Sequence, residues 1–89
     1  MIAVWLKIDE TRVAQALREA GQKLDGVEGE VVLDFSSVCR IDPSVLRAME
    51  EFAGIADEKG VKVVLRGVNV DVYKVLKLVK LASRFSFVS

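Results

Sequence analysis

The side chains best placed for chemistry in this sequence are short acids, hydroxyls and amides that follow predicted strands. Asp9 follows the first predicted strand, Ser36 the second and Asn69 the third, and Asp42-Pro43-Ser44 opens the helix after Ser36. Because the carboxyl ends of parallel strands meet at one edge of a sheet, we expect these residues to form a single polar rim. Such a rim can accept hydrogen bonds and carry a phosphate, but it offers no base that works near neutral pH.

The amino-acid composition excludes most kinds of catalytic site. The chain has no histidine and one cysteine, Cys39, so it forms no Ser-His-Asp or Cys-His arrangement and no imidazole zinc site. It also lacks the glycine-rich loops that bind dinucleotides or nucleoside triphosphates. We therefore expect no enzyme activity, no catalytic residue, no metal site and no cofactor. A lone cysteine forms no internal disulfide, which indicates a reducing, cytoplasmic compartment, and Cys39 is expected to be a small buried hydrophobe.

Ser44 is the hydroxyl whose position best suits a covalent switch. Asp42 and Pro43 predict the N-cap and first residue of a helix, which puts Ser44 in the first turn. A phosphate there would meet free backbone N–H groups and the positive end of the helix dipole, and it would repel Asp42. Ser44 is therefore a candidate phosphorylation site. The alternative interpretation is an ordinary first-turn serine with no further role.

Size and charge restrict the class of protein. The 89 residues predict one domain, 1–89, and the 52% hydrophobic content with a mean hydropathy of +0.33 excludes disorder. Thirteen basic residues balance thirteen acidic ones, so no overall field attracts nucleic acid or an anionic membrane. No apolar run approaches the roughly 20 residues of a membrane helix, and no signal peptide is indicated. We expect a cytoplasmic protein without direct membrane insertion.

Apolar periodicity divides the chain into alternating strands and helices. Strands are predicted at 2–8, 30–35, 61–65 and 85–88, and helices at 11–24, 43–58 and 70–81. This order, β-α-β-α-β-α-β, predicts an α/β fold with a mostly parallel central sheet and helices packed on it. The strand at 30–35 is almost continuously apolar, which is typical of a strand covered on both faces.

Local signals predict where the helices begin and end. Asp9 or Thr11 is expected to cap the first helix and Asp42 the second, because their side chains accept bonds from free N–H groups. Gly60 is expected to end the second helix. In the third helix, the apolar spacing predicts that Val79 faces inward.

The stretch 31–46, VVLDFSSVCRIDPSVL, resembles the signature of STAS domains, the fold of bacterial anti-sigma factor antagonists. Those proteins carry a strand ending in an L-D-hydrophobic-S turn, followed by a D-S-S-G-L motif that opens a helix. Here 33–36 (LDFS) resembles the turn, Asp42 and Leu46 match the ends of the motif, and Ser44 falls on the serine phosphorylated in the antagonists. The segments 6–9, 60–65 and 72–78 resemble further parts of the family, so the resemblance covers nearly the whole chain.

The resemblance implies a regulatory protein–protein interaction module built on a small STAS-like domain, shortened at both termini. Its implied partner is an anti-sigma-like serine kinase that phosphorylates Ser44. The implied partner-binding residues are Asp9, Ser36, Asp42, Ser44 and Val45. Short termini would leave a sheet edge or apolar face open, so self-association is a further expectation.

Two positions depart from the motif, since Pro43 replaces its first serine and Val45 replaces its glycine. The family glycine leaves space for a kinase beside the serine, and Val45 is expected to fill part of that space. These departures, together with the run 65–69 and its following Val72-Tyr73, are similar to the small STAS subunit of bacterial phospholipid-transporting ABC systems. This alternative implies a constitutive partner, the ATPase subunit, and a Ser44 that stays unmodified.

Overall fold

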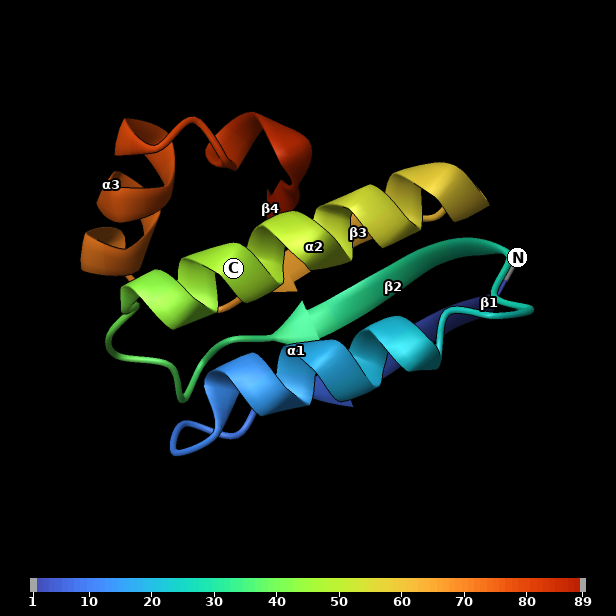
Figure 1. Cartoon of the computed structure of the whole chain (residues 1–89), viewed down its shortest axis with the longest axis horizontal. Helices are drawn as coiled ribbons and strands as arrows, with labels where there is room; N and C mark the ends of the chain where they lie inside the picture. Colours follow the sequence, from blue (N-terminus) through green and yellow to red (C-terminus); the bar gives the residue numbers. More distant parts are fainter. Residues whose placement is uncertain (1, 89) are drawn as a thin grey trace.

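The computed structural model describes residues 2–88, with side chains from Val4 onward, as an α/β structure. In chain order its elements are β1 (Ile2–Lys7), α1 (Val13–Gln22), β2 (Gly29–Asp34), α2 (Pro43–Lys59), β3 (Lys62–Arg66), α3 (Val70–Leu78), the short 3-10 turn η1 (Ala82–Arg84) and β4 (Ser86–Val88) (Figure 1). This order confirms the predicted fold class. Met1 and Ser89, the two ends of the predicted 1–89 domain, lie outside the described residues.

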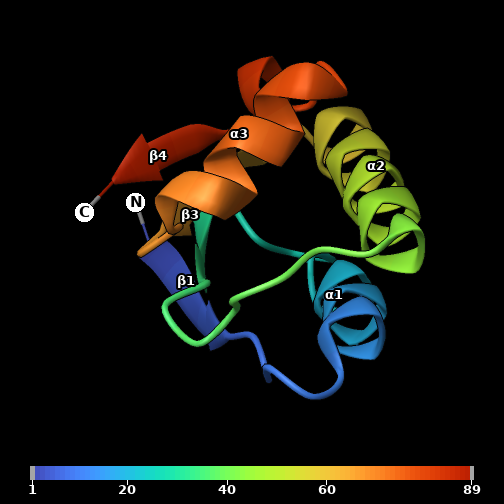
Figure 2. The ribbon, with the colours of Figure 1, turned by 90° about the vertical axis from the view of Figure 1, so that its left-hand side faces the viewer.

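The sheet is parallel throughout and follows the order β1-β2-β3-β4. Because each right-handed crossover leads to the next strand in the same direction, α1, α2 and α3 fall on one face of the sheet. Figure 2, a view turned by 90°, shows the strands on the left, α1 and α2 on the right, and α3 at the top between them. The middle of β2 is buried on both faces, as its apolar run predicts, although within residues 2–88 helices cover only one of these faces. On the open face Val32 is still only 5% exposed, because Trp5 and Val64 flank it in register.

The hydrophobic core lies between the sheet and the helices. Val31, Leu33 and Leu65 project from the sheet and are fully buried, as are Leu17 of α1 and Phe52 of α2. Burial of such side chains is worth about 1.5–3 kcal/mol each. This packing holds α1 and α2 against one another and fixes where their N-terminal turns lie.

The ends of α2 follow the sequence signals, whereas the start of α1 does not. Asp42 caps α2 by accepting a bond from the N–H of Val45, and Gly60 ends the helix with a φ of 68°. In α1 the N-cap is Arg12, and no side chain caps it. The prediction that Asp9 or Thr11 caps this helix is therefore wrong. The Asp9 carboxylate is engaged in a tighter turn before the helix, where it accepts bonds from the N–H and hydroxyl of Thr11.

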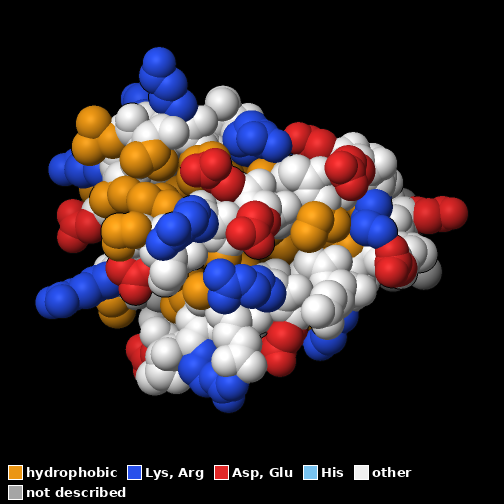
Figure 3. Space-filling view, in the orientation of Figure 1, with side chains coloured by type: hydrophobic (Ala, Val, Ile, Leu, Met, Phe, Trp, Pro, Cys, Tyr) orange, Lys and Arg blue, Asp and Glu red, His pale blue; other side chains and the backbone are white. Residues whose placement is uncertain are grey.

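Helix α3 ends at Leu78, three residues earlier than predicted. Lys80 adopts a φ of 64°, which breaks the helical backbone, and the chain continues through η1. As a result Leu81 is buried in the position expected for Val79, which is 46% exposed, so the prediction for Val79 is wrong. Hydrophobic side chains gather at the end of the molecule where α3 lies (Figure 3), and Val70 and Leu78 are among the exposed ones.

Candidate functional site

The carboxyl edge of the sheet carries the predicted rim residues in two groups. Asp42 and Ser44 share a hollow with the first turn of α1 and with the turn before it, which includes Thr11, whose N–H and hydroxyl donate to Asp9. Ser36 lies apart from this hollow, against Gly67 in the turn after β3. Among the described residues no hydrogen bond links Asp9 or Ser36 to Ser44. We use the name rim for Asp9, Ser36, Asp42 and Ser44, all of which are exposed.

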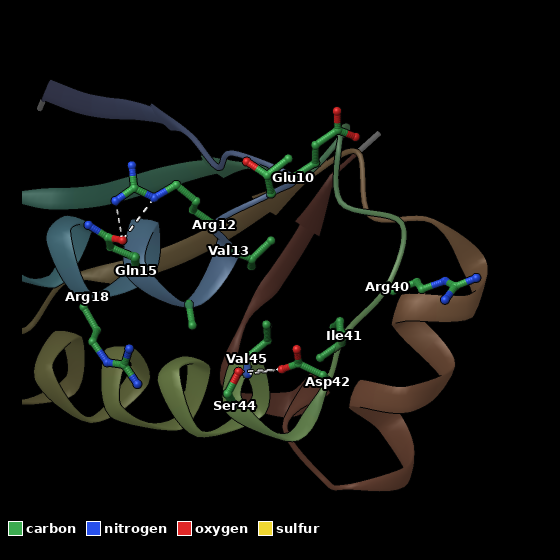
Figure 4. A pocket seen from close by; sticks show the side chains of 12 residues that line it. Glu10, Arg12, Val13, Gln15, Arg18, Arg40, Ile41, Asp42, Ser44 and Val45 are labelled. Atoms are coloured by element: carbon green, nitrogen blue, oxygen red, sulfur yellow. Dashed lines mark hydrogen bonds between the residues drawn. The ribbon is translucent and has the colours of Figure 1, made fainter.

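Asp42 organises the start of α2. Its Oδ1 accepts a hydrogen bond from the Ser44 hydroxyl at 2.6 Å and another from the Val45 N–H at 2.9 Å (Figure 4). These bonds favour the ionised carboxylate, and the Ser44 hydroxyl is the larger cause of the lowered pKa of Asp42. The rim therefore presents an exposed serine hydroxyl held by an ionised acid.

The stability of the domain is expected to fall in acid because of this capping carboxylate. The pKa of Asp42 is lower in the folded than in the unfolded protein, so its contribution is complete above about pH 4 and is lost as the pH falls through the folded pKa. Thermal unfolding followed by circular dichroism at pH 6 and pH 3 will test this.

The matched control is Asp42→Asn, because asparagine also caps helices but carries no charge. This variant should show a smaller loss of melting temperature between the two pH values than the wild type. Equal losses in both proteins would contradict the assigned role of Asp42. Asp9 and Asp34, whose pKa values are also lowered by hydrogen bonds, first of all from the Thr11 N–H and the Ser36 hydroxyl respectively, account for the remaining loss.

A hollow of about 690 Å³ separates the first turns of α1 and α2 beside Ser44. Its lining includes three arginines, Arg12, Arg18 and Arg40. Arg12 donates to Gln15, and Figure 4 shows Arg18 reaching from α1 toward α2 while Arg40 points away. Within residues 2–88 no ion pair occupies these guanidinium groups. The hollow thus has arginine side chains in its lining together with Ser44, which the sequence does not reveal because Arg12 and Arg18 belong to the start and body of α1 and Arg40 to the connection before α2.

Val45 lies below the rim and not beside the Ser44 hydroxyl. Its side chain is 5% exposed, belongs to the core and forms part of the floor of the hollow together with Val13. The expectation that Val45 fills the space beside Ser44 is therefore wrong, since the helix turns this side chain inward. As a predicted partner contact Val45 offers almost no side-chain surface, and Ser44 is open to approach.

The connection between β2 and α2 also differs from expectation at Cys39. This residue is exposed, so the prediction of a buried hydrophobe is wrong. Val38 occupies the adjacent buried position, and its carbonyl oxygen accepts a bond from Asn69 at 3.3 Å. Asn69 also caps α3 through the N–H of Val72, so this residue, which the sequence placed among the candidate polar residues, has a structural role that links two turns.

Neither a metal site nor a membrane span is found in the part of the chain that the structure describes. No three acidic or cysteine side chains among residues 2–88 converge to hold a metal ion. No helix in the same residues is long and apolar enough to cross a bilayer.

The comparison with protein families agrees with this architecture. The family model described as "Mlab, STAS domain" matches residues 9–88, which include every rim residue. A search of curated proteins finds no match. STAS domains are regulatory or protein-interaction modules and are in general non-enzymatic. A match of this extent, on a parallel α/β fold of the expected order, shows that the chain belongs to the STAS domain family.

Proposed function

We propose that the chain is a regulatory module that binds a kinase-like or anti-sigma-like protein over the rim, and that phosphorylation of Ser44 releases this partner. The observation that carries the proposal is the exposed Ser44 hydroxyl, held at 2.6 Å by the Asp42 carboxylate at the start of a 17-residue helix. The inward turn of Val45 supports it, because the approach to the hydroxyl is open.

A phosphate on Ser44 would be compatible with the fold and unfavourable for the complex. The free N–H groups and the dipole of α2 favour negative charge at this end of the helix. Arg18 on the facing helix adds positive charge near the same hollow. In the complex, however, the phosphate and Asp42 would be two negative groups enclosed by the partner, and their repulsion and desolvation would oppose binding.

A second candidate is a constitutive subunit that binds and supports the ATPase of a phospholipid-transporting ABC system. The match to the family described as "Mlab, STAS domain" favours it, and so do Pro43 and Val45, which replace the first serine and the glycine of the antagonist motif. In this case Asp42-Pro43-Ser44 is a helix start within the docking surface, and Ser44 is never modified.

Capture of the tagged protein from its native host, with mass spectrometry of the eluate, separates these candidates. If the chain is a switch, we expect a fraction of the peptide that contains Ser44 to carry phosphate. We also expect more partner bound to Ser44→Ala than to the wild type. For the constitutive subunit we expect a transporter ATPase, no phosphate, and equal amounts bound to both proteins. An eluate in which neither class of partner is enriched over that of an untagged strain would contradict both.

A further inference from the structure

The face of the sheet opposite the helices is open in the structure of residues 2–88. Parallel sheets are almost always covered on both faces, so an open face is unusual for this fold. Trp5 lies there with 59% of its surface exposed. Arg66, two strands away, places its guanidinium 5.5 Å from the centre of the Trp5 ring. A large aromatic side chain in such a position is typical of an interface.

The strand register arranges the open face in three rows. The middle row is apolar or small and contains Trp5, Val32, Val64 and Ser86. The row toward the amino ends of the strands includes Glu30 and Lys62, and the row toward the carboxyl ends includes Lys7, Asp34, Arg66 and Val88. In both outer rows, acid on β2 stands next to base on β3.

We propose that a second copy of this chain covers the open face, packed sheet to sheet with a two-fold axis along the strands between β2 and β3. Rotation about this axis places β2 of one copy opposite β3 of the other. Each row of residues then faces the same row of the second copy. Glu30 then faces Lys62 of the second copy, and Asp34 faces the second copy's Arg66, which gives four pairs of opposite charge around Val32 and Val64. These two valines are already buried in the single chain, so the charged pairs and Trp5 provide most of the contact. Facing sheets lie about 10 Å apart, a distance that these long side chains span together.

The outer strands fit the same arrangement. The axis exchanges β1 with β4, so Trp5 lies opposite the small Ser86 of the second copy. A large residue against a small one allows the two faces to approach. In the single chain the Arg66 guanidinium lies over the Trp5 ring, so pairing with Asp34 of the second copy requires this side chain to turn away from Trp5.

Charge excludes the other symmetric arrangement of aligned sheets. A two-fold axis across the strands would place each strand over its own copy and reverse the rows. Glu30 would then face Asp34 of the second copy, and Lys62 would face the second copy's Arg66, which gives four pairs of like charge. Such juxtapositions disfavour a complex. The face is therefore complementary to itself in one orientation only. The face is narrow, because it consists of four strands about 4.8 Å apart. The contact area is therefore small, which predicts a weak and reversible dimer.

Sedimentation equilibrium over a wide range of concentrations tests the proposal with the purified chain. The wild type is expected to dimerise, and Glu30→Lys is expected to raise the dimer dissociation constant about tenfold or more, because the introduced ammonium group would face Lys62 of the opposite copy on both sides of the axis. The double exchange Glu30→Lys with Lys62→Glu should restore the constant to within about threefold of the wild type. Circular dichroism melting confirms that each variant is folded.

The matched control is Glu58→Lys, which makes the same charge change on an exposed position of α2 and should leave the constant unchanged. A wild type that stays monomeric at every concentration would overturn the proposal, and a different partner would then cover the face. A tighter dimer in Glu30→Lys would also overturn it, because that result requires the axis across the strands. The rim is not involved in any of these variants, so the outcome is independent of the proposed function.

Discussion

Aspartate in place of Ser44 is expected to weaken binding of the partner about 30-fold or more while the fold stays intact. The new carboxylate would lie in the first turn of α2, where the helix dipole favours it and offsets its repulsion from Asp42, so the free protein stays folded. In the complex it would stand beside Asp42, which is ionised because Ser44 and Val45 donate to it in the wild type. A charge left unpaired in an interface costs at least about 2 kcal/mol, or about 30-fold in affinity.

Two neutral variants separate charge from shape at this position. Ser44→Asn is close in size to Ser44→Asp but uncharged, and Ser44→Ala removes only the hydroxyl. Both are expected to bind within about threefold of the wild type when the affinity for the purified partner is measured by calorimetry, since neither leaves an unpaired charge in the interface. If Ser44→Asp binds as tightly as Ser44→Asn, the rim is not the docking surface and both candidate functions lose their site.

The fold could be predicted from the sequence because its signals are local and agree with one another. Asp42-Pro43 and Gly60 marked both ends of α2, and alternating runs of apolar residues marked every strand. Errors arose where two local structures compete for the same atoms. Asp9 bonds to Thr11 in a turn and so does not cap α1, and the φ of Lys80 shortens α3.

The candidate site was less predictable, because it depends on which way side chains point. The sequence placed Asp42 and Ser44 together on the start of one helix, and the structure confirms their contact. It could not show that Val45 turns into the core, that Cys39 is exposed, or that Arg18 of α1 lies near the start of α2. Each of these facts depends on the packing of segments that are distant in sequence.

The open face of the sheet is a further feature that could not be predicted from the sequence alone. The apolar run of β2 predicted cover on both faces, but it does not say what provides the second cover. Only the register between strands puts Glu30 beside Lys62 and Asp34 beside Arg66, and only that juxtaposition reveals a charge pattern that a second copy can match. Continuous apolar character in a strand therefore indicates buried side chains, and neighbouring strands of the same sheet can bury them, as Trp5 and Val64 do for Val32.

Alanine in place of Gly67 is expected to destabilise the domain by about 2–5 kcal/mol, a large fraction of the total for a chain of this size. Gly67 has a φ of 74°, where a side chain costs about 1–2 kcal/mol. In addition, a Cβ at this position would lie 2.9 Å from the Cβ of Ser36 and 3.1 Å from its Cα. Overpacking of this kind costs about 1–3 kcal/mol, and it arises because Gly67 in the turn after β3 lies against Ser36 in the turn after β2.

Gly26→Ala is the matched control, because Gly26 also has a positive φ, 80°, but a Cβ there meets nothing within 4 Å. Chemical denaturation should therefore show a loss of about 1–2 kcal/mol for Gly26→Ala, from the backbone alone, and a clearly larger loss for Gly67→Ala. The contact itself is isolated by adding Ser36→Gly, which removes the nearest atom: the two changes should cost less together than the sum of their separate effects. Additive effects, or equal losses at the two glycines, would show that Ser36 does not limit the space at Gly67. The rim would then tolerate larger residues at this turn, and the position of Ser36 would not depend on close approach of the two strand ends.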